Sequence, residues 1–162
     1  MAGKFLLFVA LVAPLFYSCS PMKTIDCPPK FTIYKDISKA YPVYTKDFQL
    51  QLKNSLNSSQ KIQDTASADL KLSTAKLRED LNQISSRVEI LAKSNIMAYQ
   101  SGICDPNVRK SFEEFQLKLA DITLQLSQID AKLEPSKGIG VSTATNVSDA
   151  QALASNILKV AK

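Results

Sequence analysis

The segment that decides the fold is Phe112–Leu133, "FEEFQLKLADITLQLSQIDAKL". Its apolar residues alternate spacings of three and four, the pattern of a helix that packs one face against a partner helix. The apolar positions of this stripe are Phe112, Phe115, Leu119, Ile122, Leu126, Ile129 and Leu133. The spacing predicts a helix over 107–134 that buries one narrow stripe, and Pro135 marks its end.

The stretch "SGICDPNV" (101–108), just before that helix, carries the signals of a tight turn. Gly102 is expected to adopt the left-handed conformation that commonly ends a helix. Asp105 is suited to cap the next helix, and Pro106 to occupy its first position. A short turn between two striped helices predicts that they are antiparallel neighbours.

Upstream of the turn, residues 45–101 contain no Pro or Gly and predict one long helix that begins at Thr45. A continuous helix of that length would extend about 85 Å. Its first half is rich in Ser, Asn and Gln, so we expect a kink or fraying near 57–59. Its second half repeats apolar residues every seven positions, which predicts a coiled-coil stripe. The repeat is Leu70, Leu77, Ile84, Leu91 and Ala98, with Thr74, Leu81, Val88 and Asn95 at the complementary positions.

Together these patterns predict an all-α fold, an antiparallel coiled-coil hairpin with a short C-terminal helix over 148–162. The helix-packing seam of the first helix is expected at Leu77, Leu81, Ile84, Val88 and Leu91. Phe112 and Phe115 should meet the region 91–98, and 126–133 should meet 74–81. A Gly/Ser/Thr-rich segment, 135–147, predicts a flexible loop, after which the short helix either docks to make a three-helix bundle or packs on another chain.

Composition fits this helical prediction and excludes several functional classes. The chain has 162 residues, with 7% aromatic residues, four Gly and no Trp, which suits narrow apolar stripes better than a thick β core. The net charge of +5 comes from interleaved charges of both signs, so no nucleic-acid footprint is indicated. There is no His, the commonest general base and metal ligand, and the cysteines lack CxxC spacing. We therefore predict neither an enzyme nor a metal or cofactor site.

The first nineteen residues, "MAGKFLLFVALVAPLFYSC", have the anatomy of a secretory signal over 1–18. Lys4 supplies a positive charge, and the apolar run that follows is shorter than the roughly 20 residues that span a bilayer. Cleavage after Ser20 would leave Pro21 at the new N-terminus, which disfavours that site. Cleavage after Ser18 makes Cys19 the first mature residue.

The segment Phe16–Cys19 resembles the lipobox of bacterial lipoproteins, in which a small residue precedes the cysteine that receives lipid. Ser18 and Cys19 match that pattern, whereas Phe16 and Tyr17 depart from its usual leucine and small residue. The resemblance implies lipidation of Cys19, and Ser20 is typical of sorting to the periplasmic face of the outer membrane rather than the inner membrane. A plain secreted or periplasmic protein and an uncleaved N-terminal anchor are the alternatives.

Lipidation of Cys19 would leave Cys27 and Cys104 as a pair in an oxidising compartment, which predicts a disulfide between them. Two unpaired thiols are the alternative. The segment 19–44, with Pro28, Pro29 and Pro42, is then expected to be an extended tether between the membrane and the helices.

These features predict a lipid-anchored scaffold or adaptor of the cell envelope that packs helices against a partner protein or against itself. A phage-derived or envelope-disrupting lipoprotein, similar to spanins, is one alternative because it shares the anchor and the coiled coil. A carrier whose helices enclose a small ligand is another.

Overall fold

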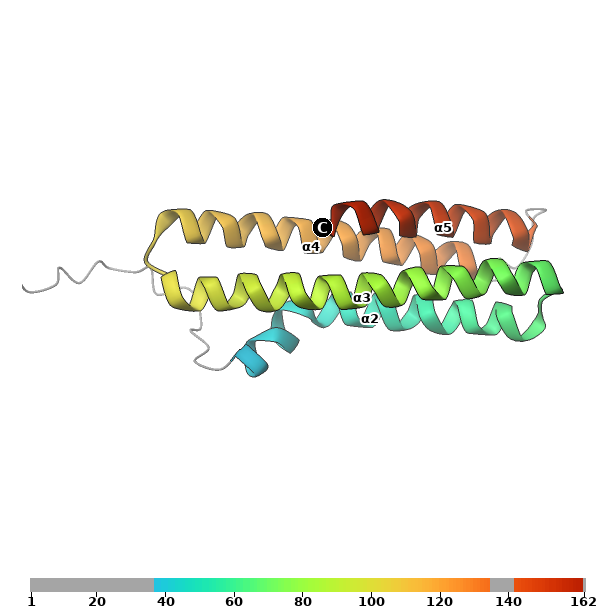
Figure 1. Cartoon of the computed structure of the whole chain (residues 1–162), viewed down its shortest axis with the longest axis horizontal. Helices are drawn as coiled ribbons and strands as arrows, with labels where there is room; N and C mark the ends of the chain where they lie inside the picture. Colours follow the sequence, from blue (N-terminus) through green and yellow to red (C-terminus); the bar gives the residue numbers. More distant parts are fainter. Residues whose placement is uncertain (1–36, 135–141, 162) are drawn as a thin grey trace, which may run out of the picture. The chain divides into compact units, whose positions relative to one another are not determined.

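The computed structural model describes residues 37–134 and 142–161, which belong to one compact unit. It is all-α: α2 (Ile37–Thr65), α3 (Ala68–Gly102), α4 (Pro106–Leu133) and α5 (Thr143–Val160). Successive helices run in opposite directions (Figure 1). The signal over 1–18, Cys19, Cys27, the rest of the expected tether up to residue 36, and residues 135–141 of the expected loop lie outside the described residues. The prediction that the last helix begins at residue 148 is wrong, because α5 begins at Thr143, inside the expected loop.

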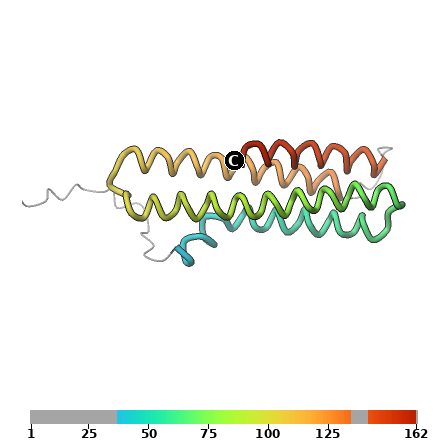
Figure 2. The backbone as a smooth tube through the Cα atoms, in the orientation of Figure 1, coloured from blue at the N-terminus to red at the C-terminus, as the bar shows by residue number. Residues whose placement is uncertain are grey.

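The four helices form a bundle in which α2 and α5 occupy opposite sides. Each of these two helices contacts both α3 and α4, but they do not contact each other. The α3–α4 pair is the predicted antiparallel hairpin, and the tube in Figure 2 shows the other two helices flanking it. The bundle thus has one helix more than the hairpin with a docked short helix that the sequence predicts.

The prediction of one long helix over 45–101 is wrong, because the chain folds back at Ala66 and Ser67. Ser67 is extended, with φ −65° and ψ 164°, and is the N-cap residue of α3. The Thr65 hydroxyl donates to the carbonyl of Lys61, a local bond that competes with helix continuation. The break between α2 and α3 contains neither the Gly nor the Pro that usually marks the end of a helix.

The start of α2 also differs from expectation, since the helix begins at Ile37 inside the predicted tether and contains Pro42. Thr45 is not a cap: its fully buried hydroxyl donates to the Tyr41 carbonyl at 2.7 Å. Pro42 has no N–H to donate and crowds the preceding turn, which bends helices. In Figure 1 the first turns of α2 are set at an angle to the rest of that helix.

The predicted stripe of α4 is buried along its whole length, as are Leu77, Leu81, Ile84 and Val88 of α3. Leu91 is only partly buried, and the buried face of α3 continues through Ala92, Ile96 and Tyr99 instead of the predicted Ala98. An α-helix drifts about 20° per heptad from a strict seven-residue repeat, so the buried stripe moves sideways along α3.

Beside the α3–α4 turn, aromatic rings fill the core. Phe112 stacks on Tyr99, with centroids 4.2 Å apart, and meets Tyr44 edge-on at 5.1 Å. The sequence predicts residues 91–98 as the neighbours of Phe112. Its ring partners Tyr44 and Tyr99 lie instead on α2 and on α3 one residue beyond that range. Because α5 packs on the other half of the α3–α4 pair (Figure 1), these rings fill space where only three helices meet.

α2 corresponds to the polar first half of the predicted long helix, and it packs against α4 through small hydroxyl residues. Ser55, Ser58, Ser59 and Thr45 are buried, although nothing in their hydropathy suggests a core. Ser55 donates to the Leu126 carbonyl at 3.0 Å, and Ser58 donates to the Asp130 carboxylate at 2.6 Å. Short side chains let α2 approach α4 closely, and these hydrogen bonds satisfy the buried hydroxyls.

Candidate functional site

A cleft lies at the end of the bundle opposite the α3–α4 turn. It has a volume of about 810 Å³ and lies where α2 and α4 end and α3 and α5 begin. Its lining residues are Ser58, Lys61, Ile62, Thr65, Ala66, Ser67, Leu70, Lys132, Leu133, Glu134, Thr143 and Asn146. We call this surface the end cleft.

The end cleft combines apolar and charged groups. Ile62, Leu70 and Leu133 supply its apolar side chains, and Leu133 is almost fully buried. Lys61 and Glu134 add exposed charges of opposite sign. An apolar surface with a few polar groups around it is the usual form of a recognition site. This arrangement is suited to holding an apolar side chain or a short amphipathic segment.

Polar contacts fix α5 beside the end cleft. Lys132 pairs with Asp149 at 2.9 Å across the α4–α5 interface. The Gln151 amide donates to the Ser73 carbonyl at 2.8 Å. Arg87 of α3 donates to the Leu158 carbonyl at 2.8 Å, which satisfies a carbonyl in the last turn of α5. The small residues Ala150 and Ala154 are fully buried, so α5 lies close to its neighbours.

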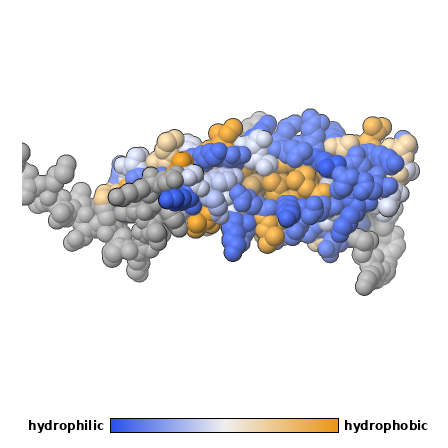
Figure 3. Space-filling view, turned by 90° about the horizontal axis from the view of Figure 1, so that it is seen from below, coloured by the Kyte–Doolittle hydropathy of each residue, from blue (hydrophilic) through white to orange (hydrophobic). Residues whose placement is uncertain are grey.

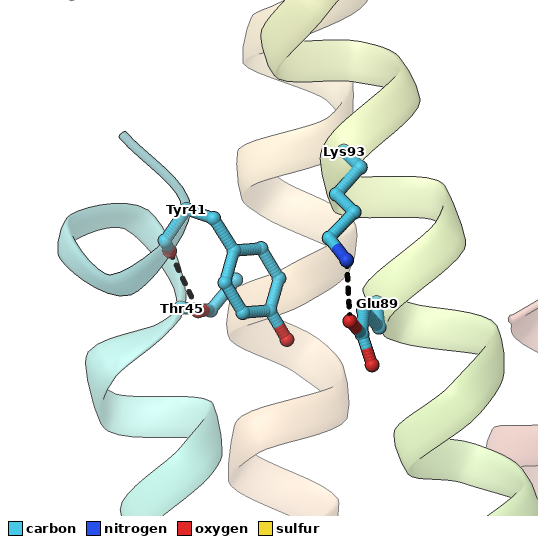
Figure 4. A network of polar contacts seen from close by, with 4 residues as sticks. All are labelled: Tyr41, Thr45, Glu89 and Lys93. Carbon is cyan, nitrogen blue, oxygen red and sulfur yellow. Dashed lines mark hydrogen bonds and ion pairs between the residues drawn. The ribbon is translucent and has the colours of Figure 1, made fainter. Parts of the chain in front are cut away.

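A second polar cluster joins α2 to α3 near the bend at Pro42 (Figure 4). The Lys93 ammonium lies 5.7 Å from the centre of the Tyr41 ring and donates to Glu89 at 2.5 Å. The hydrogen bond from Lys93 to Glu89 raises the pKa of Lys93. Both charges are well exposed, so this ion pair contributes little to the stability of the fold.

The predicted turn residues are placed as follows. Asp105 is the N-cap of α4 and accepts a hydrogen bond from the Asn107 amide at 2.8 Å, and Pro106 begins that helix. Gly102 is the last residue of α3 and does not have the left-handed φ that the sequence predicts. A Cβ there would lie 2.9 Å from Val108, so close approach, not backbone freedom, favours glycine.

Of the predicted cysteine sites, only Cys104 lies among the described residues, exposed in the α3–α4 turn. Cys19 and Cys27 lie outside them. Within 37–134 and 142–161, no group of three or more His, Cys, Asp or Glu residues is arranged to hold a metal ion. No helix in those ranges combines the length and apolar character of a membrane span.

Sequence reasoning missed the end cleft, because its residues come from four helix ends that no periodic pattern connects. The available signal was local, since the hydroxyl residues Thr65 and Ser67 flank the point where one helix ends and the next begins. Comparison of the chain with protein-family models, with curated proteins and with solved structures finds no match to any of them.

Proposed function

We propose that this protein is a lipid-anchored scaffold of the bacterial cell envelope that holds a protein partner in its end cleft. The observation that carries the proposal is the end cleft itself, a volume of about 810 Å³ with apolar side chains and charged groups, built on four helix ends. Helical bundles commonly place binding sites between facing helices. The lipobox-like Phe16–Cys19 segment supports the anchor and the compartment.

The same proposal includes a disulfide between Cys27 and Cys104, which would attach the segment before α2 to the α3–α4 turn. A bridge that closes so long a loop would contribute about 4 kcal/mol in the chain-entropy model, less any strain. It also leaves no spare cysteine once Cys19 carries lipid.

The anchor is tested by the intact mass of the protein extracted from membranes. The expected species begins at Cys19, carries acyl chains, and gains two mass units on reduction. Cys19→Ala should abolish labelling by an alkyne fatty acid. An unlipidated chain that begins at another residue would contradict the anchor without touching the cleft.

The cleft is tested by photo-crosslinking in cells from a probe at Thr143, with a probe at Leu117 as the matched control. Both positions are exposed, but Leu117 lies on the outer surface of α4, away from the end cleft. One discrete crosslinked species from Thr143 alone, lost in Lys61→Glu, is the expected result. Equal crosslinking from both positions would contradict a partner site in the cleft.

A carrier for a small ligand is the second candidate, because the cleft volume falls within the range of about 300–1,000 Å³ typical of ligand pockets. Native mass spectrometry after gentle extraction separates the two, since a carrier would retain a small molecule. The spanin-like alternative gains no support, because the described helices fold back on one another and the longest has 35 residues.

A further inference from the structure

The outer surface of α2 carries a stripe of exposed residues. It consists of Val43, Lys46, Leu50, Lys53 and Asn57, spaced by three and four residues like a helix-packing seam. Val43 is 55% exposed and Leu50 is 52% exposed. We call this surface the α2 outer face. It begins just after Pro42, so the bend in α2 does not interrupt it.

The charge of the α2 outer face has one sign. Lys46 and Lys53 lie between its apolar residues, and no acidic residue is part of the stripe. The nearest acid along the chain, Asp47, lines the groove between α2 and α4 instead. All the ion pairs found within the described ranges involve α3, α4 or α5, and none involves α2. The lysines of the stripe are therefore available to an anionic partner.

A second copy of the chain is a poor occupant, because copies paired through this face would bring lysines of like sign together. A surface that alternates lysines with exposed aliphatic side chains matches an anionic phospholipid headgroup layer instead. The aliphatic side chains enter the interface, and each lysine near such a surface contributes about 1 kcal/mol. Figure 3 views the molecule from below and shows a mostly hydrophilic surface that is interrupted by smaller hydrophobic areas.

We propose that the α2 outer face rests on an anionic phospholipid surface, an inference that uses the lipid anchor of the proposed function. α2 is the first described helix after Cys19, and the intervening chain of about 18 residues reaches at most about 60 Å. The anchored bundle can therefore lie on the bilayer along α2. Because α2 and α5 are on opposite sides of the bundle, α5 then faces away from the membrane.

The test measures amine acetylation of the full chain, extracted in detergent and reconstituted on vesicles of phosphatidylcholine with or without phosphatidylglycerol. Mass spectrometry gives the rate at each lysine of the vesicle-bound protein. Phosphatidylglycerol is expected to slow acetylation of Lys46 and Lys53 at least roughly threefold, and salt should reverse the effect. Lys71 and Lys76, exposed on α3, are the matched controls and should be unchanged.

The variant Lys46→Glu should abolish the slower acetylation at Lys53, whereas the control variant Lys71→Glu should leave it intact. Equal rates at Lys46 and Lys53 on both vesicles, or dimers that depend on these residues, would overturn the proposal. Failure of the anchor has a different signature. The chain would then not float with pure phosphatidylcholine vesicles, yet would bind those with phosphatidylglycerol in a salt-sensitive manner.

Discussion

Replacing Ser55 by Leu is expected to destabilise the bundle, although this change makes α2 more hydrophobic. Ser55 is fully buried between α2 and α4 and donates to the Leu126 carbonyl at 3.0 Å. Overpacking a closed interface costs about 1–3 kcal/mol, and the lost hydrogen bond about 1 kcal/mol. The higher helix propensity of Leu offsets only a few tenths of a kcal/mol. The free energy of unfolding should therefore fall by about 2–4 kcal/mol.

Thermal unfolding followed by far-UV circular dichroism measures this effect, which corresponds to a decrease of roughly 6–16 °C in Tm for a domain of this size. Gln49→Leu is the matched control, since it adds the same side chain to an exposed position of the same helix. Its effect should stay within about 0.5 kcal/mol. An unchanged or raised Tm for Ser55→Leu would refute the close, serine-lined contact between α2 and α4.

Three further outcomes follow from single contacts. Burial raises the pKa of Asp80, so stability is lost as pH rises from the ordinary carboxyl pKa through the raised one; Asp80→Asn should raise Tm at pH 7 and leave it unchanged at pH 3. Gly102→Ala should lower Tm in the native chain but raise it in a Val108→Ala background, because the clash at 2.9 Å disappears and helix propensity remains, as a double-mutant cycle would show. Arg87→Ala should speed hydrogen exchange of the last turn of α5, because the Leu158 carbonyl loses its donor, while α4 amides keep their rates.

The all-α class and the α3–α4 hairpin could be predicted from the sequence because their stripes combine large apolar residues with a regular period. The Asp105 cap and Pro106 could be predicted for a similar reason, since each satisfies a local need of the α4 N-terminus. These signals depend on neighbouring residues, so they can be recognised without knowledge of the tertiary contacts.

The place of α2 could not be predicted, because its buried face is made of hydroxyl residues whose partners are more than 70 residues away, at Leu126 and Asp130. Hydropathy describes Ser55 and Ser58 as surface residues, whereas their small volume is what suits them to a close helix contact. The end cleft depends on the same missing information, since it exists only once α2 has folded back beside α3. Local patterning therefore predicted the helices better than their assembly.

The aromatic cluster beside the α3–α4 turn has a consequence for spectroscopy. The chain contains no Trp, so tyrosine dominates its near-ultraviolet signal. Among the described residues, Tyr41, Tyr44 and Tyr99 all contact groups in that half of the bundle, and none lines the end cleft. The circular dichroism of these three tyrosines should therefore report loosening where three helices meet and stay unchanged when α5 detaches. A probe introduced into α5 would give the two halves separate optical signatures.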